Sequence, residues 1–237
     1  MTTSNDLKTV ISQEYAGRIS GASSCCDTDE SCNASYPVEV LDSMPEGVVS
    51  FGCGTPTTIG SLKPGEWVLD LGSGAGLDCF LAAREVGPQG RVIGVDFTPA
   101  MLERANENRE KLGLNNVEFR MGDIESLPVE ANSIDVILSN CVINLAPDKD
   151  AVFREAFRVL RSGGRLMVSD IVLTRPATGE EIRDMALLTG CISGSLPAEE
   201  YVGKVESAGF VDARWAGDPP TDDTRFWFSA SITATKP

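Results

Sequence analysis

Glycine and aspartate gather in one short run of this sequence, Asp70-Leu71-Gly72-Ser73-Gly74-Ala75-Gly76. The run follows an apolar segment and precedes a stretch with helical periodicity, so it is predicted to form the turn from a strand into a helix. Glycines at such a turn let the backbone approach a ligand closely, and the N–H groups at the helix start bind polar or negative atoms. A dinucleotide fingerprint would place glycine at position 77, where this chain has Leu77. The motif is therefore D-x-G-x-G-x-G and differs from the form that binds NAD(P).

Two further acidic positions follow the next two apolar segments. Asp96 comes 22 residues after Gly74, where a carboxylate can accept both hydroxyls of a ribose. Gly122-Asp123-Ile124 follows the third segment, where an apolar side chain and a carboxylate could flank and hydrogen-bond an adenine. A single aspartate at a strand end often caps a helix, but acids in order after successive strands are harder to assign to capping. The pattern predicts a nucleotide-type site.

Cysteine is the second residue type that could do chemistry here. The chain has seven cysteines and no histidine. The absence of imidazole excludes mechanisms that need a histidine base and most zinc and non-haem iron sites. Cys53, Cys141 and Cys191 lie in loop-like contexts near the predicted site, Cys141 directly after the fourth predicted strand. One cysteine alone is more often a small buried hydrophobe, but three together favour a soft, thiophilic ligand. Zinc stays open, although the paired C-x₂-C knuckles of structural sites are missing, and a trivalent ion that takes three thiolates fits better.

The elements that must position these residues are indicated by hydrophobic periodicity. Short apolar runs alternate with helical segments after residue 66, which predicts βαβ units and a parallel sheet. Helices are expected at Pro99–Leu112, with Thr98 as N-cap, and at Lys149–Leu160, with Gly163-Gly164 as the turn that follows. Strands are expected at 67–71, 91–96, 117–121, 134–139, 165–173, 208–216 and 225–234. The fold class is thus α/β, an open, doubly wound sheet of about seven strands, whose ligands bind beyond the strands' carboxyl ends.

Composition restricts the class of partner. The chain has 237 residues and a formal net charge of −15. This charge would repel a phosphate backbone or an anionic membrane surface, so neither nucleic acid nor membrane is an expected partner. The opening segment lacks the features of a signal peptide, and no apolar run approaches a membrane span. We therefore expect a cytoplasmic protein whose cysteines are mostly reduced.

The first 60 residues differ in composition from the rest. A short amphipathic stretch carries Leu7, Val10, Ile11 and Tyr15, and a small, polar run with Cys25, Cys26 and Cys32 follows it. We expect residues 1–60, which also include Cys53, to form an N-terminal arm or lid. Disorder is the alternative for this segment. Residues 61–237 are expected to form the cofactor-binding domain.

The motifs DLGSGAG, GVDFTPAM, GDIESLP, SNCVINL and FREAFRVLRSGGRLMVSD resemble those of the class I S-adenosylmethionine-dependent methyltransferases. The resemblance covers nearly everything from Lys63 to Ala234 and implies a Rossmann-like sheet with an antiparallel last strand. It implies that the methionine moiety, the ribose and the adenine of the cofactor are bound in turn along the chain. The implied cofactor-binding residues are Asp70, Gly72, Ser73, Gly74, Asp96, Phe97, Met101, Gly122, Asp123, Ile124 and Asn140.

Three cysteine contexts sharpen this resemblance. GCGTPTTIGSLKPGEWVLDLGSGAGLD, SNCVINL and GCISG are similar to segments of the arsenite S-adenosylmethionine methyltransferases. The similarity implies that Cys53, Cys141 and Cys191 are catalytic and hold arsenite, free or as a thiol conjugate. It also implies that Cys25 and Cys26 capture substrate and exchange disulfides, with thioredoxin or glutathione as the thiol reductant.

Two other functions stay open at this point. A C-methyltransferase of quinone or sterol type would share the cofactor half but would leave the three cysteines unexplained. A thiol-based arsenic or metal binder would use the cysteines but would have no need of Asp70, Asp96 and Asp123.

Overall fold

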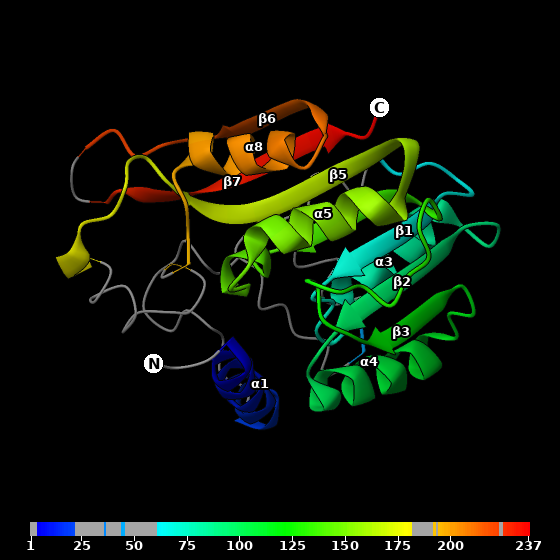
Figure 1. Ribbon diagram of the computed structural model, residues 1–237. Coiled ribbons are helices and arrows are strands. Elements are labelled where there is room, and N and C mark those ends of the chain that lie inside the picture. The colour runs from blue at the N-terminus through cyan, green and yellow to red at the C-terminus, as the bar shows by residue number, and fades with distance from the viewer. Residues whose placement is uncertain are drawn as a thin grey trace.

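The structure of the protein, a computed structural model, describes residues 4–21, 36, 44–45, 61–181, 192, 194–222 and 225–237. The described residues form one seven-stranded sheet in the order β3-β2-β1-β4-β5-β7-β6, with helices on both faces (Figure 1). The sheet confirms the predicted α/β fold. Its strands are β1 (Trp67–Leu71), β2 (Arg91–Asp96), β3 (Val117–Met121), β4 (Ile134–Asn140), β5 (Leu160–Leu173), β6 (Val211–Gly217) and β7 (Trp227–Thr235).

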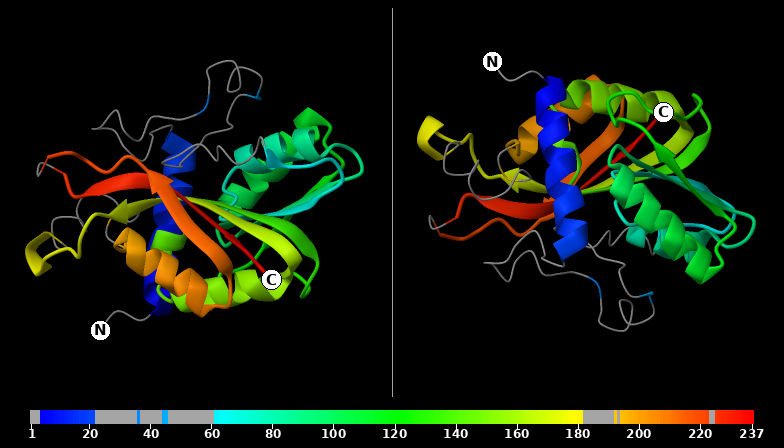
Figure 2. Two further views of the ribbon diagram at one scale, coloured as in Figure 1. Left: turned by 90° about the horizontal axis from the view of Figure 1, so that it is seen from above. Right: turned by 90° about the horizontal axis from the view of Figure 1, so that it is seen from below.

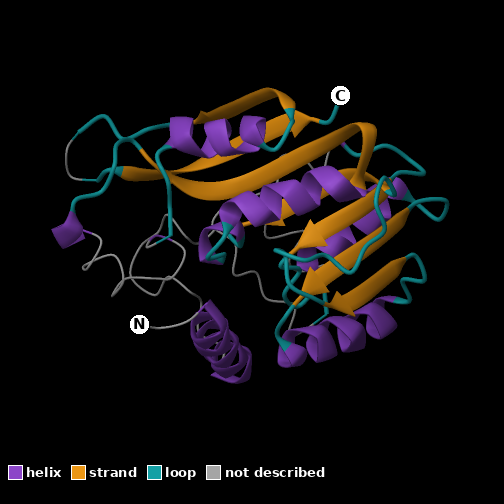
Figure 3. Cartoon of the chain, in the orientation of Figure 1, coloured by secondary structure: helices purple, strands orange, loops and turns teal. Residues whose placement is uncertain are grey.

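The five strands from β3 to β5 run parallel (Figure 3). Helices form the crossovers from β1 to β2, from β2 to β3 and from β4 to β5, whereas residues 122–133 join β3 to β4 without a helix. Parallel strands covered on both faces read as continuous apolar runs, and four of the five residues of β1 are buried. Val68 packs in a cluster with α3, while Leu69 packs on the other face with α5 and α8. The helices are α3 (Leu77–Val86), α4 (Pro99–Leu112), α5 (Lys149–Val159) and α8 (Ala198–Ser207).

Local signals set the bounds of α4 and α5 as predicted. Thr98 precedes α4 and Pro99 occupies its first turn, although the Thr98 side chain makes no capping hydrogen bond to the helix. Gly113 ends α4 in the left-handed region, with φ of 66°. Asp148 begins α5, and its Oδ1 accepts the Ala151 amide at 2.9 Å. The sequence pattern therefore located both helices to within one residue.

The edge beyond β5 is antiparallel, because β7 pairs antiparallel with both β5 and β6. The predicted turn at Gly163-Gly164 is wrong, because both residues lie inside β5, which starts directly after α5. Their position coincides with a shift in the β4–β5 register between Ile134 and Val136. Gly163, with φ of 79°, absorbs this irregularity, and its amide donates to the Lys236 carbonyl at 2.8 Å.

The N-terminal segment contains a helix, α1 (Ser4–Gly21), which contacts α4. In Figure 1 the arrowheads of β1 and β2 point to the side of the molecule where α1 lies, and the view from below in Figure 2 shows α1 crossing in front of the sheet. Ile11 and Tyr15 are half-buried, but Val10 is 57% exposed. The predicted apolar stripe is therefore wrong at Val10, because α1 docks through the face that carries Lys8, Ile11 and Tyr15. None of the helices in the described part of the chain is long and apolar enough to cross a membrane.

Candidate active site

The candidate site lies where the strand order reverses. From β1 the chain continues to β2 and β3 on one side, and β4 and β5 lie on the other side of β1. The connections that follow β1 and β4 therefore lead in opposite directions and leave a crevice at the carboxyl ends of these two strands. Gly72 follows β1, and Val142 follows β4 by two residues. A Cβ added to Gly72 would lie 2.4 Å from Val142, so only glycine allows the two turns to approach this closely. Gly72 also has φ of 67°, which a side chain would disfavour.

Asp96 fixes the glycine turn from the end of β2. Its Oδ2 accepts the Gly74 amide at 3.0 Å, and its Oδ1 accepts the Thr98 amide at 2.8 Å. Burial raises the pKa of the Asp96 carboxyl, and the hydrogen bonds from Thr98 and Gly74 lower it. The carboxylate thus joins the two successive loops that the sequence predicted at the cofactor site.

Two further carboxyl groups, those of the buried Asp70 and the half-buried Asp78, lie beside this turn. Burial raises the pKa of Asp70 well above its usual range, and the neighbouring charges of Asp78 and Asp96 raise it further. The Cys79 thiol donates to Asp70 Oδ2 at 3.2 Å, so Cys79 is a buried hydrogen-bond donor behind the turn. Asp78 accepts a hydrogen bond from the Tyr36 hydroxyl and one of 3.3 Å from Asn140 Nδ2. Burial raises the pKa of all three carboxyl groups, so a ligand that brings positive charge would favour their ionised forms.

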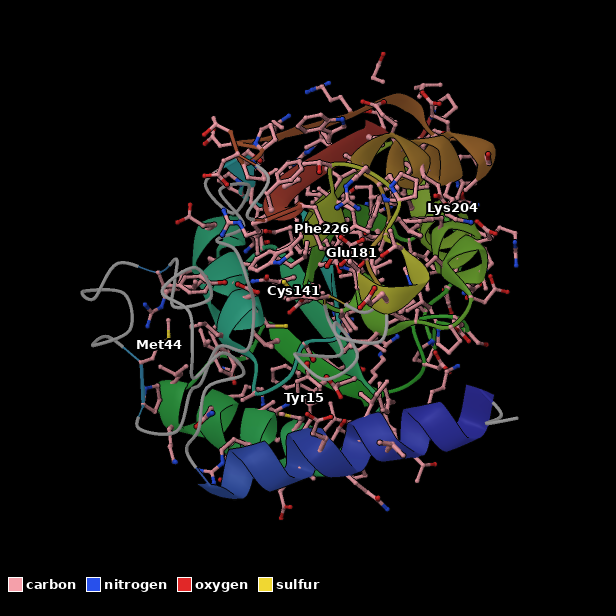
Figure 4. The ribbon with its side chains drawn as sticks, turned by 90° about the vertical axis from the view of Figure 1, so that its left-hand side faces the viewer. Tyr15, Met44, Cys141, Glu181, Lys204 and Phe226 are labelled. Carbon is pink, nitrogen blue, oxygen red and sulfur yellow. The ribbon has the colours of Figure 1, made fainter. Side chains whose placement is uncertain are left out.

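A pocket of about 690 Å³, including the space at its mouth, opens between these loops. The Ser73 hydroxyl is buried in its wall and has no hydrogen-bond partner among the described residues, so it can still bind a ligand. Ile11 and Tyr15 of α1 close one side, and Figure 4 shows Tyr15 on the side of α1 that faces Cys141. The pocket is lined by Ile11, Tyr15, Gly72, Ser73, Gly74, Ala75, Leu77, Asp78, Asp96, Phe97, Thr98, Met101, Asn140, Cys141, Val142 and Leu145.

Most residues predicted at the cofactor site meet in this pocket, but those predicted for adenine do not line it. Asp70 lies buried beneath the glycine turn, and Ile124 packs in the core with 6% exposure. Asp123 Oδ2 instead accepts Lys8 Nζ of α1 at 2.6 Å, and Glu125 Oε2 accepts the same ammonium at 2.5 Å. The adenine contact of Gly122, Asp123 and Ile124 stays a prediction. The predicted residues in the pocket wall are Gly72, Ser73, Gly74, Asp96, Phe97, Met101, Asn140 and Cys141.

Sequence reasoning did not predict eight of the pocket-lining residues, namely Ile11, Tyr15, Ala75, Leu77, Asp78, Thr98, Val142 and Leu145, nor the adjacent Tyr36. Asp78 lies in the first turn of the helix after the glycine run, and an acid at that position is usually interpreted as favourable to the helix dipole. Tyr36 gave no signal of a site role, because it precedes β1 by about thirty residues and meets Asp78 only through the tertiary fold.

Cys141 is the one predicted arsenic ligand within the described residues. It is 3% exposed, lines the pocket, and has φ of 57°, an uncommon conformation for a residue other than glycine. Its amide donates to the Ser169 carbonyl at 2.8 Å, which holds the strained residue at the strand end. No group of three His, Cys, Asp or Glu side chains that could hold a metal is found in the described parts of the chain. The other predicted cysteines, Cys25, Cys26, Cys32, Cys53 and Cys191, lie outside the described residues.

Comparisons with known proteins agree with this geometry. A family model described as a methyltransferase domain matches residues 62–209. An arsenite methyltransferase of Halobacterium salinarum is 43% identical, over 92% of this chain and 60% of its own length. The human arsenite methyltransferase is 37% identical, over 85% of this chain and 58% of its own. The chain thus spans about three-fifths of the length of these two curated relatives.

A solved structure extends the match to three dimensions. The arsenic(III) S-adenosylmethionine methyltransferase of Chlamydomonas reinhardtii superimposes with a TM-score of 0.68 at 35% identity, covering 85% of this chain and 71% of that one. Sequence and fold thus point to one group of proteins. The chain belongs to the methyltransferase-domain family and, within it, to the arsenite S-adenosylmethionine methyltransferases.

Proposed function

We propose that this chain transfers methyl groups from S-adenosylmethionine to thiol-bound trivalent arsenic. The observation that carries the proposal is the position of Cys141. This residue is buried and lines the same pocket as Gly72, Gly74 and Asp96. A thiol in the wall of the pocket can place a bound acceptor against a cofactor held by the glycine turn. Family membership supports both the cofactor at the glycine turn and the acceptor at the thiol.

The pocket suits the cofactor chemically. S-adenosylmethionine would supply an electrophilic methyl group on a positively charged sulfonium. The sulfonium charge would stabilise the ionised forms of Asp70, Asp78 and Asp96, whose pKa values are raised by burial, and the buried Ser73 hydroxyl is available to bind a ligand. We assign Asp96 to the ribose, Asp70, Gly72 and Gly74 to the methionine moiety, and Asp123 with Ile124 to the adenine. We propose as cofactor-binding residues Asp70, Gly72, Ser73, Gly74, Asp96, Phe97, Met101, Gly122, Asp123, Ile124 and Asn140.

The proposed arsenic ligands are Cys53, Cys141 and Cys191. Three thiolates neutralise a trivalent arsenic and leave its lone pair in place. The lone pair forms the new As–C bond while the C–S bond of the sulfonium breaks, and S-adenosylhomocysteine leaves with that electron pair. No proton has to be abstracted from the nucleophile, which agrees with a chain that has no histidine. Catalysis would then come mainly from proximity and orientation.

The transfer oxidises arsenic by two electrons, so a reduction must follow. We propose that two protein thiols supply these electrons by forming a disulfide, with Cys25 or Cys26 as one partner. Thioredoxin or glutathione would then reduce the disulfide, which places the protein in a reducing compartment such as the cytoplasm.

We also propose that residues 1–60 act as a lid on a methyltransferase domain formed by residues 61–237. Support comes from α1, whose Ile11 and Tyr15 form part of the pocket wall. Lys8 on the same face pairs with two acids of the domain, Asp123 and Glu125.

The test is the release of S-adenosylhomocysteine by the purified, reduced full chain with S-adenosylmethionine and a thiol reductant, with and without arsenite. We expect arsenite-dependent release, with methylated arsenic species identified by mass spectrometry. If the cofactor binds but arsenite stimulates no release, another acceptor, such as a quinone- or sterol-like molecule, replaces arsenic. If arsenite binds but the cofactor does not, the chain is an arsenic binder.

A further inference from the structure

Asp78 lies in the first turn of α3 and is half-buried in the wall of the pocket. Its Oδ2 accepts a hydrogen bond of 3.3 Å from Nδ2 of Asn140, the last residue of β4, and its Oδ1 accepts one from the Tyr36 hydroxyl. Asn140 Nδ2 also donates to the Tyr36 hydroxyl oxygen at 3.5 Å. Two donors from other parts of the chain therefore fix the orientation of the Asp78 carboxyl group.

The strand order places Asp78 and Asp96 on opposite sides of the glycine turn. β1 lies between β2 and β4, and Leu71 at the end of β1 pairs with Ser139 of β4. Asp96 ends β2, whereas Asp78 is hydrogen-bonded to Asn140 at the end of β4. With the ribose at Asp96 and the adenine toward β3, the amino-acid end of the cofactor extends across the glycine turn toward Asp78.

The charges in the pocket favour a cationic group beside Asp78. The described residues that line the pocket include no lysine or arginine. Burial raises the pKa of the Asp78 carboxyl, and the hydrogen bonds from Tyr36 and Asn140 lower it. An ammonium group of the ligand would supply the positive charge that the pocket wall lacks, and would form a charge-assisted hydrogen bond with the carboxylate.

Ser73 gives a second, independent sign that a polar ligand group binds here. Its side chain lies in the same pocket wall and is 7% exposed, and its hydroxyl has no hydrogen-bond partner among the described residues. A buried hydroxyl without a partner is costly, so a ligand atom that pairs with it is favoured. An amino acid offers both a carboxylate for this hydroxyl and an ammonium for Asp78.

We infer that Asp78 binds the α-ammonium group of S-adenosylmethionine, with Tyr36 and Asn140 as the residues that position its carboxylate. The inference rests on the proposed function, since it assumes that this cofactor binds with its ribose at Asp96. It adds a specificity-determining residue to the site, because Asp78 would select ligands that carry the amino group.

The test measures the binding of two probes to the reduced full chain by isothermal titration. The probes are S-adenosylhomocysteine and the analogue in which hydrogen replaces its α-amino group. We expect the parent to bind S-adenosylhomocysteine about 10- to 100-fold more tightly than the analogue, as for hydrogen bonds between charged groups. Asp78→Asn keeps the size of the side chain but loses the charge, so this preference should fall by about 10-fold.

A third probe identifies the group on which Asp78 acts. S-adenosylhomocysteine without its carboxyl group keeps the ammonium, so Asp78→Asn should weaken its binding by the same factor as that of S-adenosylhomocysteine. The matched control is Asp150→Asn. Asp150 also lies in the first turn of a helix, α5, and pairs with Lys204 at 3.0 Å, but it does not line the pocket. This control should keep the parent's preference for the amino group.

The outcomes separate the role of Asp78 from general disturbance of the pocket. Equal weakening of both initial probes by Asp78→Asn would overturn the inference. Equal affinity of the parent for the two probes would also overturn it, whether or not the variant folds. If the parent binds no S-adenosylhomocysteine, the proposed function itself fails. Parent binding with an unchanged amino-group preference in Asp78→Asn overturns only the role of Asp78.

Discussion

The Gly74 amide donates a 3.0 Å hydrogen bond to Oδ2 of Asp96, across 22 residues of sequence. This bond links the glycine turn after β1 to the end of β2, and the Thr98 amide occupies the other carboxylate oxygen. The proposed ribose ligand is thus also the group that holds the glycine turn in shape. Changes at Asp96 should therefore affect cofactor affinity both directly and through the turn.

Asp96→Ala should weaken the binding of S-adenosylmethionine by about 10- to 100-fold, because hydrogen bonds to a charged group contribute about 1.5–3 kcal/mol. Isothermal titration with S-adenosylmethionine measures this loss. Asp96→Asn keeps an oxygen for one of the two amides and should fall between the parent and the alanine variant. Cofactor binding at full strength in Asp96→Ala would disprove the ribose assignment.

Cys141→Ser and Cys191→Ser should each abolish arsenite-dependent methylation, because a hydroxyl does not replace a thiolate as a ligand of trivalent arsenic. Product analysis by mass spectrometry checks the activity, and titration with S-adenosylhomocysteine should give the parent affinity. Cys79→Ser is the control, since Cys79 donates only to the buried Asp70 and should leave arsenite methylation in place. Unchanged turnover in either of the first two variants would remove that residue from the ligand set.

Gly72→Ala should disrupt the pocket, because the added Cβ would collide with Val142 in a backbone conformation that already disfavours side chains. Gly113→Ala provides a matched comparison, since Gly113 has φ of 66° but open space around the added atom. The Gly113 variant should lose about 1 kcal/mol of stability through backbone strain alone and should keep cofactor affinity. Thermal unfolding and cofactor titration of both variants test this difference, which would vanish if the close contact had no role.

The buried carboxyl group of Asp170 should make the free energy of unfolding depend on pH. Burial raises its pKa from 3.8 to about 7, although the Tyr201 hydroxyl, at 3.2 Å, and the Ile171 amide partly oppose this shift. Between these values the folded chain retains a proton that the unfolded chain has lost, so this group makes the free energy of unfolding fall as pH rises.

Asp170→Asn removes this titration. The stability of the variant relative to the parent should increase by about 1 kcal/mol per pH unit from pH 4 to 7 and then level off. Urea unfolding of both proteins at several pH values measures the difference. A difference that does not change with pH would show that Asp170 titrates normally.

Lys8→Glu should loosen the docking of α1, because it replaces the cation between Asp123 and Glu125 with a third negative charge. The pair is partly exposed, so we expect less than about 1 kcal/mol from it and a smaller effect at high salt. Hydrogen exchange of residues 4–21 measures the loosening. Lys63→Glu changes the net charge equally on an exposed loop and should leave α1 exchange at the parent rate.

Residue patterns along the chain were sufficient to predict the strands β1 to β4, the helix α4 and the turns that carry Asp70, Gly72, Gly74 and Asp96. These features depend on signals that are local in the chain: apolar runs, helical periodicity, and glycine or proline at turns. The Gly163-Gly164 turn was predicted wrongly by the same logic, because both glycines lie inside β5 at a shift of its register with β4, where they exchange backbone hydrogen bonds with Lys236.

Which of these turns meet could not be read from the residue pattern and depends on the way the strands are ordered in the fold. The reversal of strand order brings Val142 and Cys141 against Gly72, and docking of α1 selects the face with Lys8, Ile11 and Tyr15 instead of Val10. The contact of Tyr36 with Asp78 and that of Asn144 with Ser195 arise in the same way. The neighbours of a strand or a helix face are set by the burial of surfaces from distant segments, a free energy that no local pattern of residues specifies.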